Sequence, residues 1–265
     1  FEFALHPVGP EVMFAAPIYA LDDGPGPIRE WREFLAKHGD RVGSLCEFST
    51  AAAGEDFPEE HWGKRVYTLL CVFNGDAHEG EALLQPLREL GDMVTDFSGQ
   101  MKYCDVQQLF DTLMPFGDFR CYWKARYLAD LPDDMIDLAM KNAAAAPSDN
   151  SISSLWNFGG ATAKVADEAT AFGDRSMGWM YSLDGVWSDP ADDDVNMAWS
   201  RDGWNSAEPF GHHGRAYLNF AGHGEDGAAL TRASFGANYQ RLVSIKTKYD
   251  PGNRFRFNQN IAPEV

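Results

Sequence analysis

The feature that most constrains the fold is an alternation of strand-like apolar runs with amphipathic helices along most of the chain. The run RVYTLLCVF at 65–73 is apolar enough for a central strand, and further strands are predicted at 1–6, 11–19, 43–50, 119–128, 151–158, 177–183 and 216–220. Apolar residues spaced by three and four predict helices at 28–39, 79–90, 105–114, 132–144, 192–205 and 234–249, with Asp105 as an N-cap. This pattern favours an α+β fold, in which helices cover one face of a mainly antiparallel sheet.

The composition excludes several classes of protein. The chain has 265 residues, of which 45% are hydrophobic, so it can bury a core and is not disordered. Its formal net charge of −18 opposes non-specific binding to nucleic acid or to anionic membranes, because the whole surface repels both. The sequence contains no run of roughly 18 apolar residues of the kind that spans a membrane. We therefore expect a soluble protein of undetermined compartment.

Motifs for metal binding and for a serine nucleophile are missing. The four cysteines form no CxxC pair, and His212 and His213 lack the partners that a zinc site needs. The glycines of 222–227 formally match GxGxxG, but Glu225 and Asp226 would occupy the place of a pyrophosphate. We interpret this loop as a turn, and we expect no bound metal.

One short segment carries groups suited to acid–base chemistry. If 216–220 is a strand, Tyr217 and Asn219 point to the same face. A phenol beside an amide can hold a substrate hydroxyl, and a tyrosine can act as a base where its surroundings favour the phenolate. The pattern alone leaves open the simpler interpretation, a buried tyrosine with a satisfied hydrogen bond.

The C-terminal region combines a helix with an extended tail. An apolar stripe runs along 234–249, and the sequence DPGN at 250–253 ends the helix in a turn. The tail RFRFNQNIAP then alternates, with Phe255 and Phe257 on one side and charged or polar side chains on the other. This alternation predicts an extended segment that lies on an apolar surface.

The tail also carries a resemblance. SIKTKYDPGNRFRFNQNIAP at 244–263 resembles the C-terminal signature of the berberine bridge enzyme-like family of FAD-linked oxidases. The segment 217–220 is similar to the family's Tyr-x-Asn-Tyr motif, 159–161 and 171–175 resemble its Gly-Gly-Ala and Phe-Pro-His-Arg surroundings, and 1–10 resembles the strand that leaves its flavin domain. The resemblance implies a substrate-binding α+β domain at 1–210, followed at 211–265 by a segment that returns to the flavin domain.

The same resemblance implies an activity. Family members oxidise a sugar, an alcohol or an alkaloid-like compound by hydride transfer to flavin, which O2 reoxidises. Carried over to this chain, the implied roles are a catalytic base, substrate-binding residues and residues near the FAD. Tyr217 is the implied catalytic base. Asn219, Ser182 and Asp184 are the implied substrate-binding residues, and Asn258 and Asn260 are implied to lie near the FAD.

The family's FAD-binding domain has no counterpart in the sequence. The chain begins at Phe1 within a strand-like segment, so we expect the missing domain to precede it, and we expect this piece alone to be inactive. Phe255, Phe257 and Ile261 should then be exposed here, because they would pack against that domain. Phe220 stands where relatives often have a tyrosine. The alternative is a stand-alone, non-catalytic module that binds a small ligand or a partner.

Overall fold

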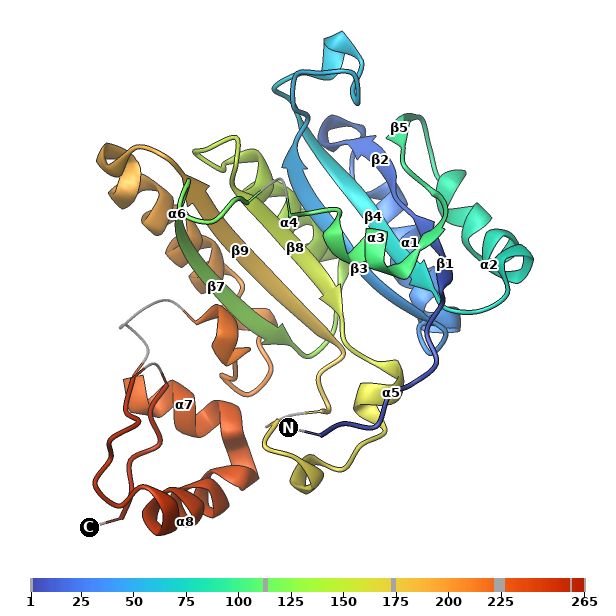
Figure 1. Ribbon diagram of the computed structural model, residues 1–265. Helices are drawn as coiled ribbons and strands as arrows, with labels where there is room; N and C mark the ends of the chain where they lie inside the picture. Colours follow the sequence, from blue (N-terminus) through green and yellow to red (C-terminus); the bar gives the residue numbers. More distant parts are fainter. Residues whose placement is uncertain (1, 112–113, 173–174, 222–226, 258, 265) are drawn as a thin grey trace.

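The computed structural model describes residues 2–111, 114–172, 175–221, 227–257 and 259–264, and its main feature is one antiparallel sheet (Figure 1). The strands are β1 (Glu11–Ala15), β2 (Pro17–Ala20), β3 (Val42–Thr50), β4 (Arg65–Phe73), β5 (Met93–Asp96), β6 (Gly99–Lys102), β7 (Arg120–Leu128), β8 (Ile152–Asn157) and β9 (Trp179–Trp187). Their order is β5-β2-β4-β3-β8-β9-β7, and β1 pairs with β4 and β6. The predicted α+β fold with a mainly antiparallel sheet is confirmed.

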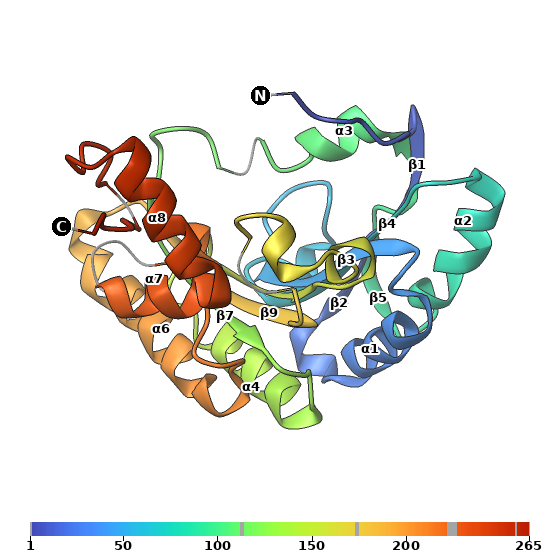
Figure 2. The same cartoon turned by 90° about the horizontal axis from the view of Figure 1, so that it is seen from below.

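The helices are divided between the two faces of the sheet (Figure 2). They are α1 (Gly26–His38), α2 (Ala77–Leu84), α3 (Tyr103–Gln108), α4 (Asp133–Ala144), α5 (Gly160–Ala163), α6 (Asp193–Ser206), α7 (Gly227–Phe235) and α8 (Tyr239–Tyr249). The side chains of α1, α2 and α4 share one large apolar core with one face of the sheet. Among the described residues, the other face is covered by α3, by the connection between β8 and β9 and by the C-terminal segment, with a smaller cluster around Phe57.

Trp31 shows how the main core joins helix to sheet. Its ring is fully buried, and its indole Nε1 donates a hydrogen bond to Ser44 Oγ at 2.8 Å. The ring also meets Trp179 edge-on, with centroids 5.4 Å apart. Because the only polar atom of the indole has a partner, Trp31 contributes its full apolar area to the contact of α1 with β3 and β9.

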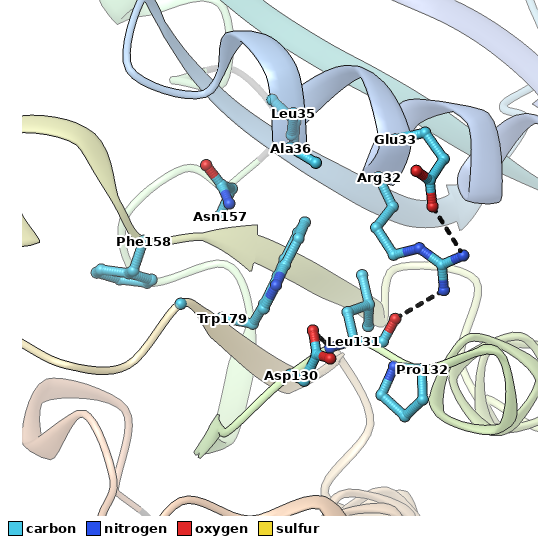
Figure 3. A pocket seen from close by; sticks show the side chains of 11 residues that line it. Arg32, Glu33, Leu35, Ala36, Asp130, Leu131, Pro132, Asn157, Phe158 and Trp179 are labelled. Atoms are coloured by element: carbon cyan, nitrogen blue, oxygen red, sulfur yellow. Dashed lines mark hydrogen bonds and ion pairs between the residues drawn. The ribbon is translucent and has the colours of Figure 1, made fainter.

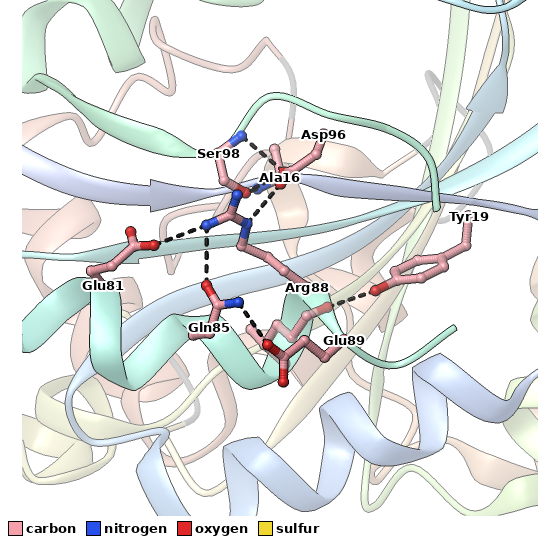
Figure 4. A network of polar contacts seen from close by, with 9 residues as sticks. Ala16, Tyr19, Glu81, Gln85, Arg88, Glu89, Asp96 and Ser98 are labelled. Carbon is pink, nitrogen blue, oxygen red and sulfur yellow. Dashed lines mark hydrogen bonds and ion pairs between the residues drawn. The ribbon is translucent and has the colours of Figure 1, made fainter. Parts of the chain in front are cut away.

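A polar network fastens the short edge strand β5 (Figure 4). Arg88, at the end of the 3-10 helix Gln85–Arg88, donates from Nε to Asp96 Oδ2 at 2.6 Å. Ser98 donates its backbone N–H to the other oxygen of Asp96 at 3.0 Å, and its Oγ accepts from Ala16 N at 2.9 Å. The edge is therefore held by side chains as well as by its ladder with β2.

Several predicted elements differ in the structure. Residues 2–6 form no strand, and the helix predicted at 79–90 ends as an α-helix at Leu84, where Pro86 opens a 3-10 turn. α3 is shorter than predicted, and Lys102 rather than Asp105 is its N-cap residue. The helix predicted at 234–249 is interrupted by Gly236, whose φ of 50° an α-helix does not accept.

The predicted strand at 216–220 is also wrong. Residues Leu218–Phe220 form a 3-10 helix, η7, closed by a bond from Phe220 N to Tyr217 O at 2.9 Å. The aromatic alternation of this segment suits a strand, but a strand needs a neighbour with which to pair. The glycine-rich loop at 222–226 and Asn258 lie outside the described residues.

Candidate active site

A row of polar side chains crosses the face of the sheet that lies away from the main core. The strand register pairs Thr68 with Glu47, Glu47 with Ser154, and Ser154 with Ser182. Residues directly opposed in neighbouring strands point to the same face, so these side chains form a line from β4 to β9. Ser154 and Ser182 are buried, and the Ser154 hydroxyl has no hydrogen-bond partner among the described residues.

Asp184 lies beside this row on β9. As the alternation of a strand requires, it shares a face with Ser182, whose Oγ donates to Asp184 Oδ2 at 3.1 Å. Burial raises the pKa of Asp184 to about 8, a shift that the Ser182 bond opposes and that nearby Glu47 reinforces. Burial likewise raises the pKa of Glu47 to about 7. The face thus holds two carboxyl groups that can take up a proton near neutral pH.

Aromatic rings stand over the polar row. Trp156 on β8 donates from its indole Nε1 to Ser182 Oγ at 3.1 Å. Phe220 meets Trp123 and Trp156 edge-on, with ring centroids 5.2 and 6.2 Å apart. Since Phe220 has no hydroxyl, it adds an apolar wall at the position where the resemblance implies a second phenol.

The C-terminal segment brings Tyr217 to the same face. The Tyr217 ring lies 5.3 Å from Phe220 and 6.4 Å from Phe158, between centroids. Asn219 donates from Nδ2 to Tyr217 Oη at 2.8 Å. The structure thus brings the predicted pair together, although the turn of η7 and not strand alternation does so.

A turn holds the first part of the tail, and later residues of the tail bond to α7 and α8. Asp250 accepts bonds from Lys246 Nζ at 2.5 Å and from the backbone N–H groups of Arg254 and Phe255 at 2.8 and 3.0 Å. The Lys246 bond and these N–H groups lower the pKa of Asp250 to about 2. Although the turn is ordered, the side chain of Phe255 is 83% exposed.

Other predicted tail residues have mixed surroundings. Phe257 is 82% exposed, as expected, whereas Ile261 is partly covered by the chain itself. Asn260 has a buried Oδ1 with no hydrogen-bond partner among the described residues. This orphaned acceptor is consistent with a donor group that another molecule or domain supplies.

A separate cavity of about 410 Å³ opens at the ends of β8 and β9, beside α1 (Figure 3). Trp179 and Asn157 point into it, and none of the predicted site residues lines it. Its arginine, Arg32, already donates to Leu131 O at 2.9 Å and to Asp133 Oδ1 at 2.8 Å. The cavity therefore offers no uncommitted guanidinium to an anion.

Two features are absent from the described ranges. In this part of the chain, no helix has the length and apolar character needed to cross a membrane. Nor do its histidine, cysteine, aspartate and glutamate side chains form a group of three or more that could hold a metal ion.

Comparison with known proteins identifies relatives. Residues 216–262 match the family model described as "Berberine and berberine like". An FAD-linked oxidoreductase of Dictyostelium discoideum is 22% identical over 267 residues, which cover 99% of this chain and 54% of that relative. The monolignol oxidoreductase AtBBE-like 13 of Arabidopsis thaliana is 32% identical over 124 residues, which cover 42% of this chain and 23% of that protein.

Solved structures share the fold. The structure of berberine bridge enzyme from Eschscholzia californica matches with a TM-score of 0.74 and 20% identity, over 98% of this chain and 56% of that one. The chain thus spans about half the length of the relatives that it matches from end to end. The family model thus matches the C-terminal segment at 216–262, and the chain as a whole is similar to an FAD-linked oxidoreductase and shares the fold of berberine bridge enzyme.

Proposed function

We propose that this chain forms the substrate-binding part of an FAD-dependent oxidoreductase that oxidises a hydroxylated small molecule, such as a sugar, an alcohol or an alkaloid-like compound. One observation carries the proposal. The Tyr217–Asn219 pair, within the segment that matches the family model, lies against rings on the sheet face that also bears Ser182 and Asp184. Such a convergence of a few polar groups with aromatic walls is typical of a small-molecule site.

Tyr217 is the proposed proton acceptor. Asn219 donates from Nδ2 to Tyr217 Oη at 2.8 Å, which fixes the position of the phenol oxygen. The phenolate takes the proton of the substrate hydroxyl while the adjacent C–H bond gives up a hydride, so the alcohol becomes a carbonyl compound. In this scheme Asn219 also orients the substrate.

Ser182 and Asp184 are proposed to bind the substrate from the sheet. Both side chains lie on the face that Tyr217 approaches, and the buried Oδ1 of Asp184 has no partner among the described residues. A buried polar atom without a partner is costly, and a substrate hydroxyl would satisfy it. Glu47 and Ser154, which the sequence did not single out, extend the same polar surface.

Bound FAD would supply the hydride acceptor and pass the electrons to O2. On this chain, the buried and orphaned Oδ1 of Asn260 fits a hydrogen-bond donor of that group, and Asn258 is proposed beside it. The remaining contacts of FAD are assigned to a partner domain that the half-length match to the relatives implies.

Phe255 and Phe257 are proposed to dock that FAD domain. The turn built on Asp250 fixes the backbone at Arg254 and Phe255, and the rings of Phe255 and Phe257 both remain exposed. Exposed apolar groups of this kind mark interfaces. The division into 1–210 and 211–265 stays a prediction under this proposal.

The test is a longer protein, produced from the complete gene. It should show flavin absorbance and consume O2 with at least one member of a panel of sugars, alcohols and alkaloid-like compounds. Tyr217→Phe should keep the absorbance and lower kcat by about 10²–10⁴-fold. Tyr103→Phe on α3 is the matched control and should retain activity. A protein without flavin would refute the proposal and favour the non-catalytic binding module.

A further inference from the structure

A directed chain of hydrogen bonds leads to Asp184. An indole nitrogen can only donate, so the 3.1 Å contact between Trp156 Nε1 and Ser182 Oγ makes the serine the acceptor. Ser182 Oγ in turn lies 3.1 Å from Asp184 Oδ2. Among the described residues these two are the side-chain partners of the Ser182 hydroxyl. Its single proton is therefore donated to Asp184 Oδ2, the acceptor that the described part of the chain offers it.

This direction makes the two oxygens of the carboxyl group unequal. Oδ2 receives the Ser182 proton, whereas Oδ1 is buried and has no partner among the described residues. If the carboxyl proton sat on Oδ2, it would meet the Ser182 proton, and that hydroxyl would lose its acceptor inside a fully buried site. A proton on Asp184 is therefore held on Oδ1.

The groups around Asp184 do not draw it toward the ionised form. Glu47 faces it from β3, Cys121 lies near it on β7, and Tyr181 interacts with it from the other face of β9. All three side chains are neutral or negative and never positive. The hydrogen bond from Ser182 favours the carboxylate form of Asp184 and lowers its pKa.

We propose that Trp156 and Ser182 are positioning residues, which hold the Asp184 proton on Oδ1 and so make this oxygen a hydrogen-bond donor to the ligand. At higher pH the same oxygen becomes an acceptor, so the face changes the kind of ligand atom that it recognises. Phe220 packs on Trp156, which links this chain of contacts to the segment that bears Tyr217. That the ligand is the substrate rests on the proposed function, and no other part of this proposal depends on it.

The experiment follows the titration of Asp184 by NMR in the 265-residue chain labelled with carbon-13, without flavin or substrate. Asp184→Asn assigns the signal. Ser182→Ala should raise the midpoint by about one to two pH units, since it removes one hydrogen bond to the charged form. Trp156→Phe should raise the midpoint by less, because the indole acts on Asp184 only by polarising Ser182.

The double variant is decisive. If Trp156 acts through Ser182, the variant that carries both changes should titrate like Ser182→Ala alone. Trp123→Phe is the matched control: this tryptophan lies directly opposite Asp184 in the register but makes no bond to Ser182, so the midpoint should not move. Additive shifts, or no shift for Trp156→Phe, would overturn the proposal. If Trp156→Phe does not fold, Ser182→Ala still tests the proposal, because this change removes only one oxygen atom and should keep the fold.

Because no turnover is measured, this outcome is independent of the proposed oxidation. A protein that holds flavin and oxidises its substrate can still fail the titration test. Conversely, a chain that titrates as described can belong to a protein without oxidase activity.

Discussion

Replacing Asp184 with asparagine should change how the stability of the chain depends on pH. In the folded chain the pKa of this carboxyl group is raised from 3.8 to about 8, mainly by burial. A raised carboxyl pKa contributes stability that is fully present below about pH 4 and is lost as the pH rises to about 8, because the unfolded chain releases the proton first. Each pH unit inside this window costs the folded state about 1.4 kcal/mol.

Urea unfolding at about pH 5 and about pH 7 measures the effect. Between these values the wild-type chain should lose about 2.5 kcal/mol relative to Asp184→Asn, whose side chain does not titrate. Glu30→Gln, an exposed change on α1 behind the other face of the sheet, is the control, and its difference from wild type should stay within about 0.5 kcal/mol. If the difference between wild type and Asp184→Asn is the same at both pH values, Asp184 is not held protonated and the reasoning fails.

Three further changes test the packing and the tail. Gly203→Ala should destabilise the chain by about 1–3 kcal/mol in urea unfolding, because a Cβ on α6 would overlap the side chain of Leu183 on β9. Trp31→Ala should cost about 3–5 kcal/mol by the same measurement, and a loss below about 1 kcal/mol would mean that the ring does not organise the core. Asp250→Ala should speed hydrogen exchange of the Arg254 amide, because the amide loses its acceptor. In the wild-type chain the same exchange should speed up as the pH falls from the ordinary carboxyl pKa toward about 2, where Asp250 becomes protonated. Equal exchange in both proteins would show that the carboxylate does not hold the turn.

Local patterns predicted the fold class but not every element. The strand at 65–73 and the helix at 28–39 were recognisable because each segment carries its own pattern of apolar residues, and both occur nearly as expected. Segment 216–220 shows where such reasoning ends. Its side chains suit a strand, yet whether a strand forms depends on a neighbour that local sequence does not reveal.

The candidate site was predictable to a similar extent. The resemblance pointed to Ser182 and Asp184, and the alternation of β9 brings both side chains to one face. Glu47 and Ser154 were missed because the polar row exists only through the register of β3 with β8, which joins residues far apart in sequence. A single acidic residue inside the strand segment GSLCEFST was the available signal for Glu47.

The outer strand β7 has one further consequence for the behaviour of the protein in solution. Its backbone is capped from outside: Tyr127 exchanges bonds with Arg215 O and His212 N, and Trp204 Nε1 donates to Ala125 O at 3.0 Å. Unpaired strand backbones are templates on which other chains can add and grow into aggregates. Removing the residues after 210 should therefore expose the backbone of β7 at Tyr127, while the Trp204 bond remains. Preparations cut there should form fibrils or precipitate under conditions in which the uncut chain stays in solution.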